Sequence, residues 1–95
     1  MATDAGVRSV PELRDFGRQV QQMGEQMYRV MTQAQNRMNN VSEGWHDEIN
    51  EKFKARFNES VQIIKRMSDE FRQYNEFLQR QCEILDQYKA NRLKI

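Results

Sequence analysis

The segment GWHDEINEKF, residues 44–53, interrupts a long helical pattern and contains the only tryptophan of the chain. The letters that lead into it, NRMNNVSEGW, are rich in asparagine, serine and glycine, which prefer turns to helix interiors. Within the segment, Asp47 stands where a side-chain oxygen can cap a new helix, and Glu48 and Glu51 fall in its positively polarised first turn. The segment therefore predicts a turn at about 41–47 with a helix on each side.

A first helix is predicted by a start signal and by apolar periodicity. In SVPE, residues 9–12, Ser9 can accept a hydrogen bond from the backbone of Glu12, and Pro11 suits a first helical turn. Apolar residues then recur at steps of three and four through Leu13, Phe16, Val20, Met23, Met27, Val30 and Ala34. Arg37 interrupts the steps, Met38 substitutes beside it, and Val41 resumes them. This pattern predicts a helix over about 10–40.

A second and longer apolar pattern follows the turn. It runs through Phe53, Phe57, Ser60, Ile64, Met67, Phe71, Tyr74, Leu78, Gln81, Leu85 and Tyr88. It predicts a helix over about 47–92, and the turn is too short for anything but an antiparallel neighbour. We therefore expect one all-α domain over residues 1–95, an antiparallel two-helix hairpin whose apolar patterns face each other, with residues 1–8 as a disordered tail.

Composition and charge exclude several classes of protein. Hydrophobic residues make up 38% of the 95 residues, too few for a large core, and the 15 basic and 14 acidic residues are mixed along the chain. Such mixing creates no one-signed field, so we expect no binding to nucleic acid. The first ten residues hold no apolar run of the Sec type and no later stretch could span a bilayer, so we expect synthesis in the cytoplasm and no membrane insertion.

The residue types that carry catalysis or bind metals are too sparse to form a site. His46 is the only histidine, and the only cysteine, Cys82, lies far along the second helix, so a metal site would lack a second nitrogen or sulfur ligand. Ser42 and Ser60 have no histidine at helical spacing, and the chain holds no glycine-rich phosphate loop. Cys82 lies beside the apolar pattern, where a buried, unreactive thiol is expected. We predict no enzyme activity, no cofactor and no metal.

The apolar surface of the second helix is wider than one partner helix needs. Beside the main pattern lie Ile49, Ile63, Phe77 and Ile84, with Arg56 and Glu70 interrupting the line. The second helix is also expected to be longer than the first by about fifteen residues, roughly 22 Å at 1.5 Å per residue. Its end would then carry Phe77, Ile84, Leu85 and Tyr88 with little cover, so we expect an interface there.

The first helix shows a second feature that suggests a partner. Gly17 and Gly24 stand seven residues apart on one flank, and Met31 and Met38 continue the same spacing. Glycines in a helix interior are either incidental or permit close approach of another backbone, and methionines pack adaptably. The predicted partner interface comprises Ile63, Phe77, Ile84, Leu85, Tyr88, Gly17, Gly24 and Met31, and we expect a homodimer or a heterodimer with a related hairpin, forming a four-helix bundle.

The turn also carries a family resemblance. A tryptophan near the middle of a chain of this length, a small or capping residue two positions on, an apolar residue at plus four and an aromatic residue at plus eight resemble the WXG family of small helical hairpins. These positions are Trp45, Asp47, Ile49 and Phe53. The chain departs from the family pattern in two places, because Asp47 replaces a glycine and because Tyr88 is followed four positions later by Arg92 rather than by an acidic residue.

The resemblance implies a substrate of type VII secretion, or the small partner of a larger exported protein. It would then leave the cell by a Sec-independent route, with a secretion ATPase or a larger effector as further partners. Trp45 would be presented for recognition. The alternative is a cytoplasmic structural or adaptor hairpin in which Trp45 only closes the tip as a lid over the last core layer.

Overall fold

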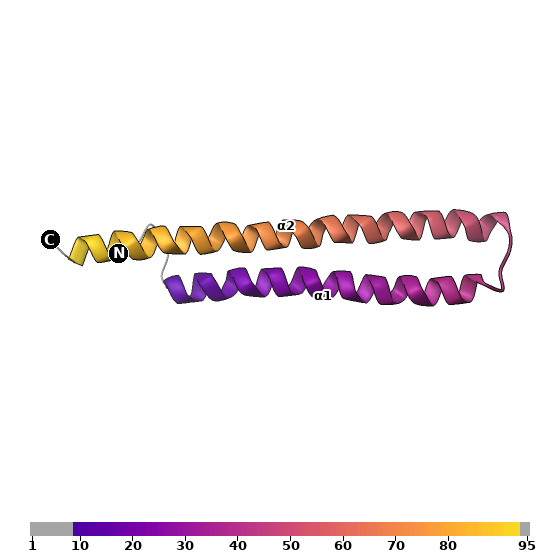
Figure 1. The fold of residues 1–95 in the computed structure, drawn as a ribbon, viewed down its shortest axis with the longest axis horizontal. Helices are drawn as coiled ribbons and strands as arrows, with labels where there is room; N and C mark the ends of the chain where they lie inside the picture. The colour runs from indigo at the N-terminus through magenta and orange to yellow at the C-terminus, as the bar shows by residue number, and fades with distance from the viewer. Residues whose placement is uncertain (1–8, 94–95) are drawn as a thin grey trace.

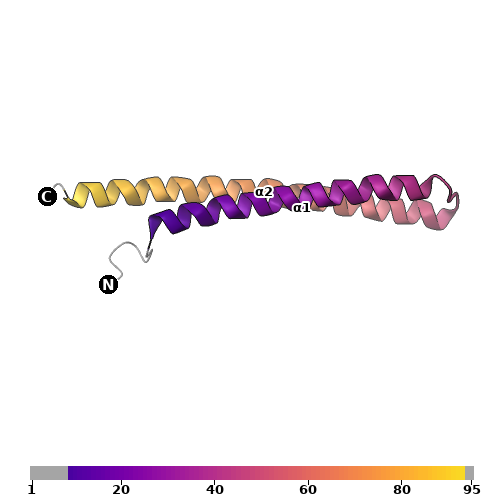
Figure 2. The ribbon, with the colours of Figure 1, turned by 90° about the horizontal axis from the view of Figure 1, so that it is seen from below.

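The computed structural model describes residues 9–93, which form two long α-helices joined by a short turn. α1 spans Val10–Ser42 and α2 spans Glu48–Leu93, compared with expected bounds of about 10–40 and 47–92. The helices lie side by side and antiparallel in a rod 73 Å long (Figure 1), and they cross at a shallow angle (Figure 2). The expected all-α hairpin is therefore confirmed, whereas the expected tail, residues 1–8, lies outside the described residues.

Local capping explains where the helices begin. The Ser9 side chain accepts a hydrogen bond from the backbone N–H of Glu12 at 3.2 Å, and Pro11 occupies the first turn of α1. At the start of α2, Asp47 Oδ1 accepts from the backbone N–H of Asn50 at 2.9 Å. Both caps satisfy backbone donors that have no partner inside the helix, so both helix starts follow from short sequence signals.

The two helices meet along one line of residues on each, spaced by seven positions. On α1 this line is Val10, Gly17, Gly24, Met31 and Met38, and on α2 it is Val61, Ser68, Asn75 and Cys82, all buried or half-buried. We call these two lines the contact lines. A Cβ atom added to Gly24 would lie only 3.0 Å from the Phe71 Cβ and 3.1 Å from the Ser68 Cα. The helices therefore approach closely, and the glycine makes this possible.

The facing of α1 agrees only in part with the sequence prediction, because Leu13, Val20, Met27 and Ala34 are half-buried as expected. The apolar pattern that begins at Leu13 was expected to face α2, yet Phe16, Met23 and Val30 are 55%, 55% and 56% exposed. The assignment of Gly17 and Gly24 to a partner interface is also wrong, because both are buried against α2 of the same chain. The physical reason is size: small residues permit a close helix contact, and large side chains are then displaced to its flank.

The end of α2 extends beyond α1, but by less than expected. The Cys82 Sγ lies 3.8 Å from the Val10 carbonyl oxygen, so the first residue of α1 lies beside Cys82. About ten residues of α2, roughly 15 Å, continue past that point (Figure 1). Ile84, Leu85 and Tyr88 lie in this extension, whereas Phe77 lies within the paired part of the hairpin, which corrects its expected position.

Candidate functional site: an open apolar face and the hairpin tip

The large apolar side chains that the helix contact leaves out gather on one side of the hairpin. On either helix, positions one before and two or three after the contact line lie on the same flank. Because both helices are right-handed and run in opposite directions, the two flanks lie on the same side. The exposed large apolar residues on these flanks are Phe16, Met23, Val30 and Val41 of α1 and Ile49, Phe53, Ile63, Tyr74, Phe77, Ile84 and Tyr88 of α2. We call this surface the open face.

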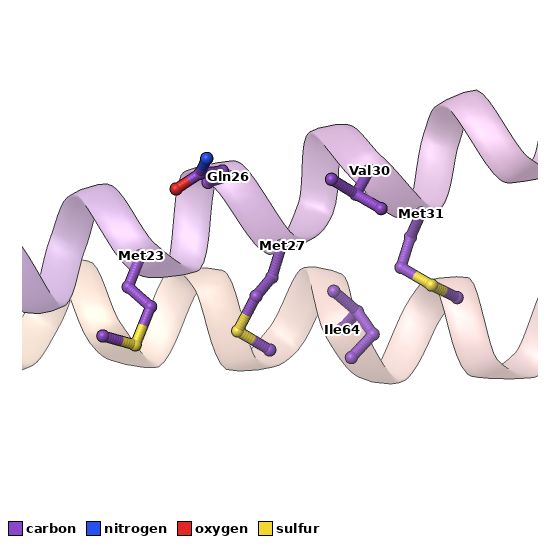
Figure 3. A pocket seen from close by; sticks show the side chains of 6 residues that line it. All are labelled: Met23, Gln26, Met27, Val30, Met31 and Ile64. Atoms are coloured by element: carbon purple, nitrogen blue, oxygen red, sulfur yellow. The ribbon is translucent and has the colours of Figure 1, made fainter.

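A shallow groove joins the two helices on the open face. It has a volume of about 370 Å³ and is lined by Met23, Gln26, Met27, Val30 and Met31 of α1 and by Ile64 of α2. In Figure 3 the three methionines extend from α1 across α2, with Ile64 between two of them. The groove shows that the apolar flanks of the two helices adjoin, and its flexible methionines can adapt to an incoming side chain.

The opposite side of the hairpin is polar and already paired. Gln35 donates to Asn58 at 2.9 Å, and Asn75 donates to Gln21 at 2.8 Å, so side-chain hydrogen bonds connect the helices along this side. Nearer the start of α1, Arg14 donates to Gln79 at 3.2 Å. These bonds satisfy polar groups that would otherwise need water, and this side therefore offers no comparable apolar surface.

A charge cluster closes the polar side near the start of α1. Arg14 forms ion pairs with Asp86 at 2.8 Å and with Glu83 at 3.3 Å. The hydrogen bond to the Asp86 carboxylate raises the pKa of the Arg14 guanidinium above its ordinary value, and Glu83 acts in the same direction. The cluster ties the first turns of α1 to the extension of α2, and we assign it a structural role.

The hairpin tip is organised by a buried asparagine that the sequence analysis missed. Asn50 is only 2% exposed. Its Oδ1 accepts from the Ser42 hydroxyl at 2.9 Å, and its Nδ2 donates to the Trp45 carbonyl at 2.6 Å. Asn50 therefore joins the end of α1, the turn and the start of α2. The only signal for it in the sequence is an asparagine three residues after the capping Asp47, where helix propensity alone would not place it.

Trp45 and Asp47 form a second, more exposed part of the tip. The Trp45 indole N–H donates to Asp47 Oδ2 at 2.8 Å, while 37% of the tryptophan surface stays exposed. The backbone N–H of Asn50 and, next, the indole N–H lower the pKa of the Asp47 carboxyl below its ordinary value, because both donate to the charged form. Asp47 thus caps α2 as expected and also fixes the indole, which stays partly exposed.

The predicted site residues are distributed over three environments. Ile49, Phe53, Ile63, Phe77, Ile84 and Tyr88 are exposed on the open face, Met31 and Leu85 are half-buried beside it, and Gly17 and Gly24 are buried inside the hairpin. The structure therefore brings most of the predicted interface residues to one surface. It separates them from the glycines, which serve the fold of the single chain.

Residues that could bind a metal ion do not come together in the described part of the chain. Within residues 9–93 no group of three His, Cys, Asp or Glu side chains is placed to hold a metal ion. Cys82 is fully buried, as the sequence predicts, and faces the Val10 carbonyl. No helix among the described residues is long and apolar enough to cross a membrane.

Comparison of the chain with family models, with curated proteins and with solved structures finds no match. The resemblance to the WXG family thus rests on the length and helical-hairpin architecture of the chain and on Trp45, Asp47, Ile49 and Phe53.

Proposed function

We propose that this chain is a non-enzymatic interaction protein whose open face docks onto the helices of another hairpin, forming a four-helix bundle. One observation carries the proposal: of the exposed large apolar side chains, all but Trp45 lie on the same side of the hairpin. A contiguous exposed apolar surface on one side of a helical hairpin is typical of a protein–protein interface. The polar side, whose groups are already hydrogen-bonded across the helices, is the surface left to solvent.

The small core of the single hairpin supports the proposal. Among the described residues, only Val10, Met38, Val61 and Cys82 are buried apolar side chains. About half of each large side chain on the open face is still exposed. Burying four of them would contribute on the order of 3 to 6 kcal/mol before ordering costs, which is a large part of the stability of a small domain. Docking would thus supply stability that the isolated hairpin lacks.

The resemblance to the WXG family suggests the biological setting. We propose a type VII secretion substrate, or the small partner of a larger exported protein, with a secretion ATPase as a further partner. The exposure of Trp45 and its anchoring by Asp47 support a presented indole. The second candidate is a cytoplasmic adaptor hairpin of a larger assembly, which the open face favours equally.

The test compares two single variants, one with a negative charge on the open face and one with the same charge on a neighbouring residue outside that face. Ile63→Asp places a carboxylate on the open face, and Gln62→Asp places one on the neighbouring exposed residue, which points away from that face. We expect Ile63→Asp to abolish complex formation in light scattering and, in the native host, release into washed culture medium, with Gln62→Asp behaving as wild type. Equal behaviour of the two variants would contradict docking through the open face, and an adaptor would stay in the cell in all cases.

A further inference from the structure

We propose that the open face binds a second copy of this chain, in an antiparallel arrangement with a twofold axis at Ile63. In this dimer, Arg56 of each copy pairs with Glu70 of the other, and the two tips lie at opposite ends. The inference rests on the proposed docking role of the open face and adds the identity of the partner and the register. It follows from the order of residues along one edge of α2.

The outer edge of the open face on α2 has a self-complementary order. Residues spaced by seven along it are Ile49, Arg56, Ile63, Glu70, Phe77 and Ile84. The first five read apolar, basic, apolar, acidic, apolar. When two such edges run antiparallel about Ile63, Ile49 meets Phe77, Arg56 meets Glu70, and Ile63 meets itself. Each of these five residues then faces a complementary one, and the ion pair forms twice by symmetry, whereas Ile84 lies past the start of α2 in the second copy.

Other registers of the same edge place charges badly. A twofold axis halfway between Ile63 and Glu70 would place Ile63 of one copy against Glu70 of the other. A twofold axis halfway between Arg56 and Ile63 would place Ile63 against Arg56. An axis at Arg56 or at Glu70 brings identical charges together. Like charges repel, and a charge against an apolar side chain is desolvated without compensation. The charge pattern therefore favours the register centred on Ile63 over its neighbours.

The other lines of α2 agree with the same axis. In that register the half-buried line has Ile64 against Ile64 and Phe57 against Phe71 of the second copy. The line between it and the outer edge pairs Phe53 with Tyr74 and the small Ser60 with the larger Met67. Apolar side chains therefore face one another along both lines, and the small Ser60 leaves room for Met67.

The same twofold axis also pairs apolar residues of α1 with apolar residues of α1 in the second copy. Because Gln35 lies opposite Asn58, Val30 lies at the level of Ile63 and therefore at the same axis. The antiparallel α1 pair then sets Val30 against Val30, with Val20 against Val41 and Met27 against Ala34 on the inner line. Arg37 comes to lie against Met23, where its alkyl stem covers the thioether and its guanidinium reaches the rim.

The alternative with both tips at the same end is disfavoured by charge. It would stack α1 of one copy on α2 of the other at equal levels, which brings Arg37 close to Arg56 twice. Nor can the single chain satisfy the edge charges, because Arg56 and Glu70 stand fourteen residues apart, about 21 Å along one helix. Within residues 9–93 neither of them forms an ion pair. The antiparallel second copy provides a partner for both.

Charge reversal with mixing tests the pair in the full chain. Arg56→Glu creates two Glu–Glu contacts in a homodimer, and Glu70→Arg creates two Arg–Arg contacts, so each variant should self-associate about tenfold more weakly or worse. An equimolar mixture of the two should associate as strongly as wild type, because every reversed charge then meets its opposite. The double variant should also recover. Sedimentation and light scattering measure the mass, and circular dichroism verifies that each exposed substitution leaves the helices intact.

Cross-linking tests the axis, in a Cys82→Ala background. Ile63→Cys should cross-link to itself on mild oxidation, whereas Ile84→Cys, on the same edge, should not, because it has no equivalent nearby in the second copy. Self-association of both charge-reversed variants at wild-type strength, or cross-linking at Ile84 instead of Ile63, would overturn the proposal. So would a wild-type chain that stays monomeric. If Ile63→Asp still abolished export in that last case, the docking function would stand and the partner would be a different chain.

Discussion

The contact lines inside the hairpin hold small or polar residues at five of their nine positions, whereas the open face beside them is built from large apolar side chains. The contact lines contain Gly17, Gly24, Ser68, Asn75 and Cys82, whereas the open face contains Phe16, Met23, Phe53, Ile63, Tyr74 and Phe77. Small residues allow the helices of one chain to approach closely, and large residues provide apolar area only if another surface covers them. The comparison teaches that apolar periodicity can identify a surface for assembly rather than the core of the single chain.

The largest effect on the hairpin itself is expected from a valine placed on the α1 contact line. Gly24→Val puts a branched side chain where even a Cβ would lie 3.1 Å from the Ser68 Cα, so the helices must separate. We expect a loss of about 2 kcal/mol of unfolding free energy, as overpacked cores show. Urea unfolding in dilute protein measures it.

The matched control is Met23→Val, one residue away on the open face. It should change the unfolding free energy of the dilute protein by less than about 0.5 kcal/mol, because Met23 has little cover within its own chain. If Gly24→Val and Met23→Val lowered the unfolding free energy equally, the difference in packing between the contact line and the open face would be contradicted.

The next effect is expected at the hairpin tip. Asn50→Ala leaves the Ser42 hydroxyl and the Trp45 carbonyl without their buried partner, which should cost about 2 kcal/mol. Asn58→Ala removes an exposed hydrogen bond to Gln35 and should cost less than about 0.5 kcal/mol. Thermal melts of both variants decide this, and a smaller loss at Asn50 than at Asn58 would show that the tip network does not hold the turn.

Trp45 should have a smaller effect on folding than a core residue. Its indole is partly exposed, so Trp45→Ala should cost about 1 kcal/mol and lower the Tm by a few degrees, while binding or export falls strongly if the indole is presented to a receptor. A lid over the core would instead cost about 3 kcal/mol or more, with function lost in proportion. Melts and export assays on the same two proteins separate these outcomes.

The smallest effect is a pH dependence at Asp47. Its pKa in the folded chain is lowered below 3.8 by the N–H groups of Asn50 and Trp45, so the cap stabilises the fold above that pH and is lost as the pH falls through the lowered value. Asp47→Asn can still accept from the backbone but does not titrate. We expect the Tm difference between wild type and Asp47→Asn to shrink below about pH 4. A difference that is constant from pH 7 to pH 2 would contradict the charged cap.

Local signals in the sequence predicted more than long-range packing did. The caps at Ser9 and Asp47 need only neighbouring residues, so helix starts were predictable. The facing of α1 was not, because a helical period of 3.6 does not state which of two adjacent stripes meets the other helix. Gly24 and Asn50 decide that facing and the turn, and their roles depend on residues from the other helix. The apolar edge around Ile63 was predicted as a surface, and its complementary order became interpretable once its level relative to α1 was known.

Sedimentation equilibrium of wild type and Ile63→Asp tests most directly whether the open face exists to be covered by a second copy. We predict that the wild-type chain sediments at twice its mass of 11.4 kDa and that Ile63→Asp sediments at 11.4 kDa, with Gln62→Asp remaining dimeric. A wild-type chain at 11.4 kDa over the whole accessible concentration range, with its helices intact, would contradict the claim.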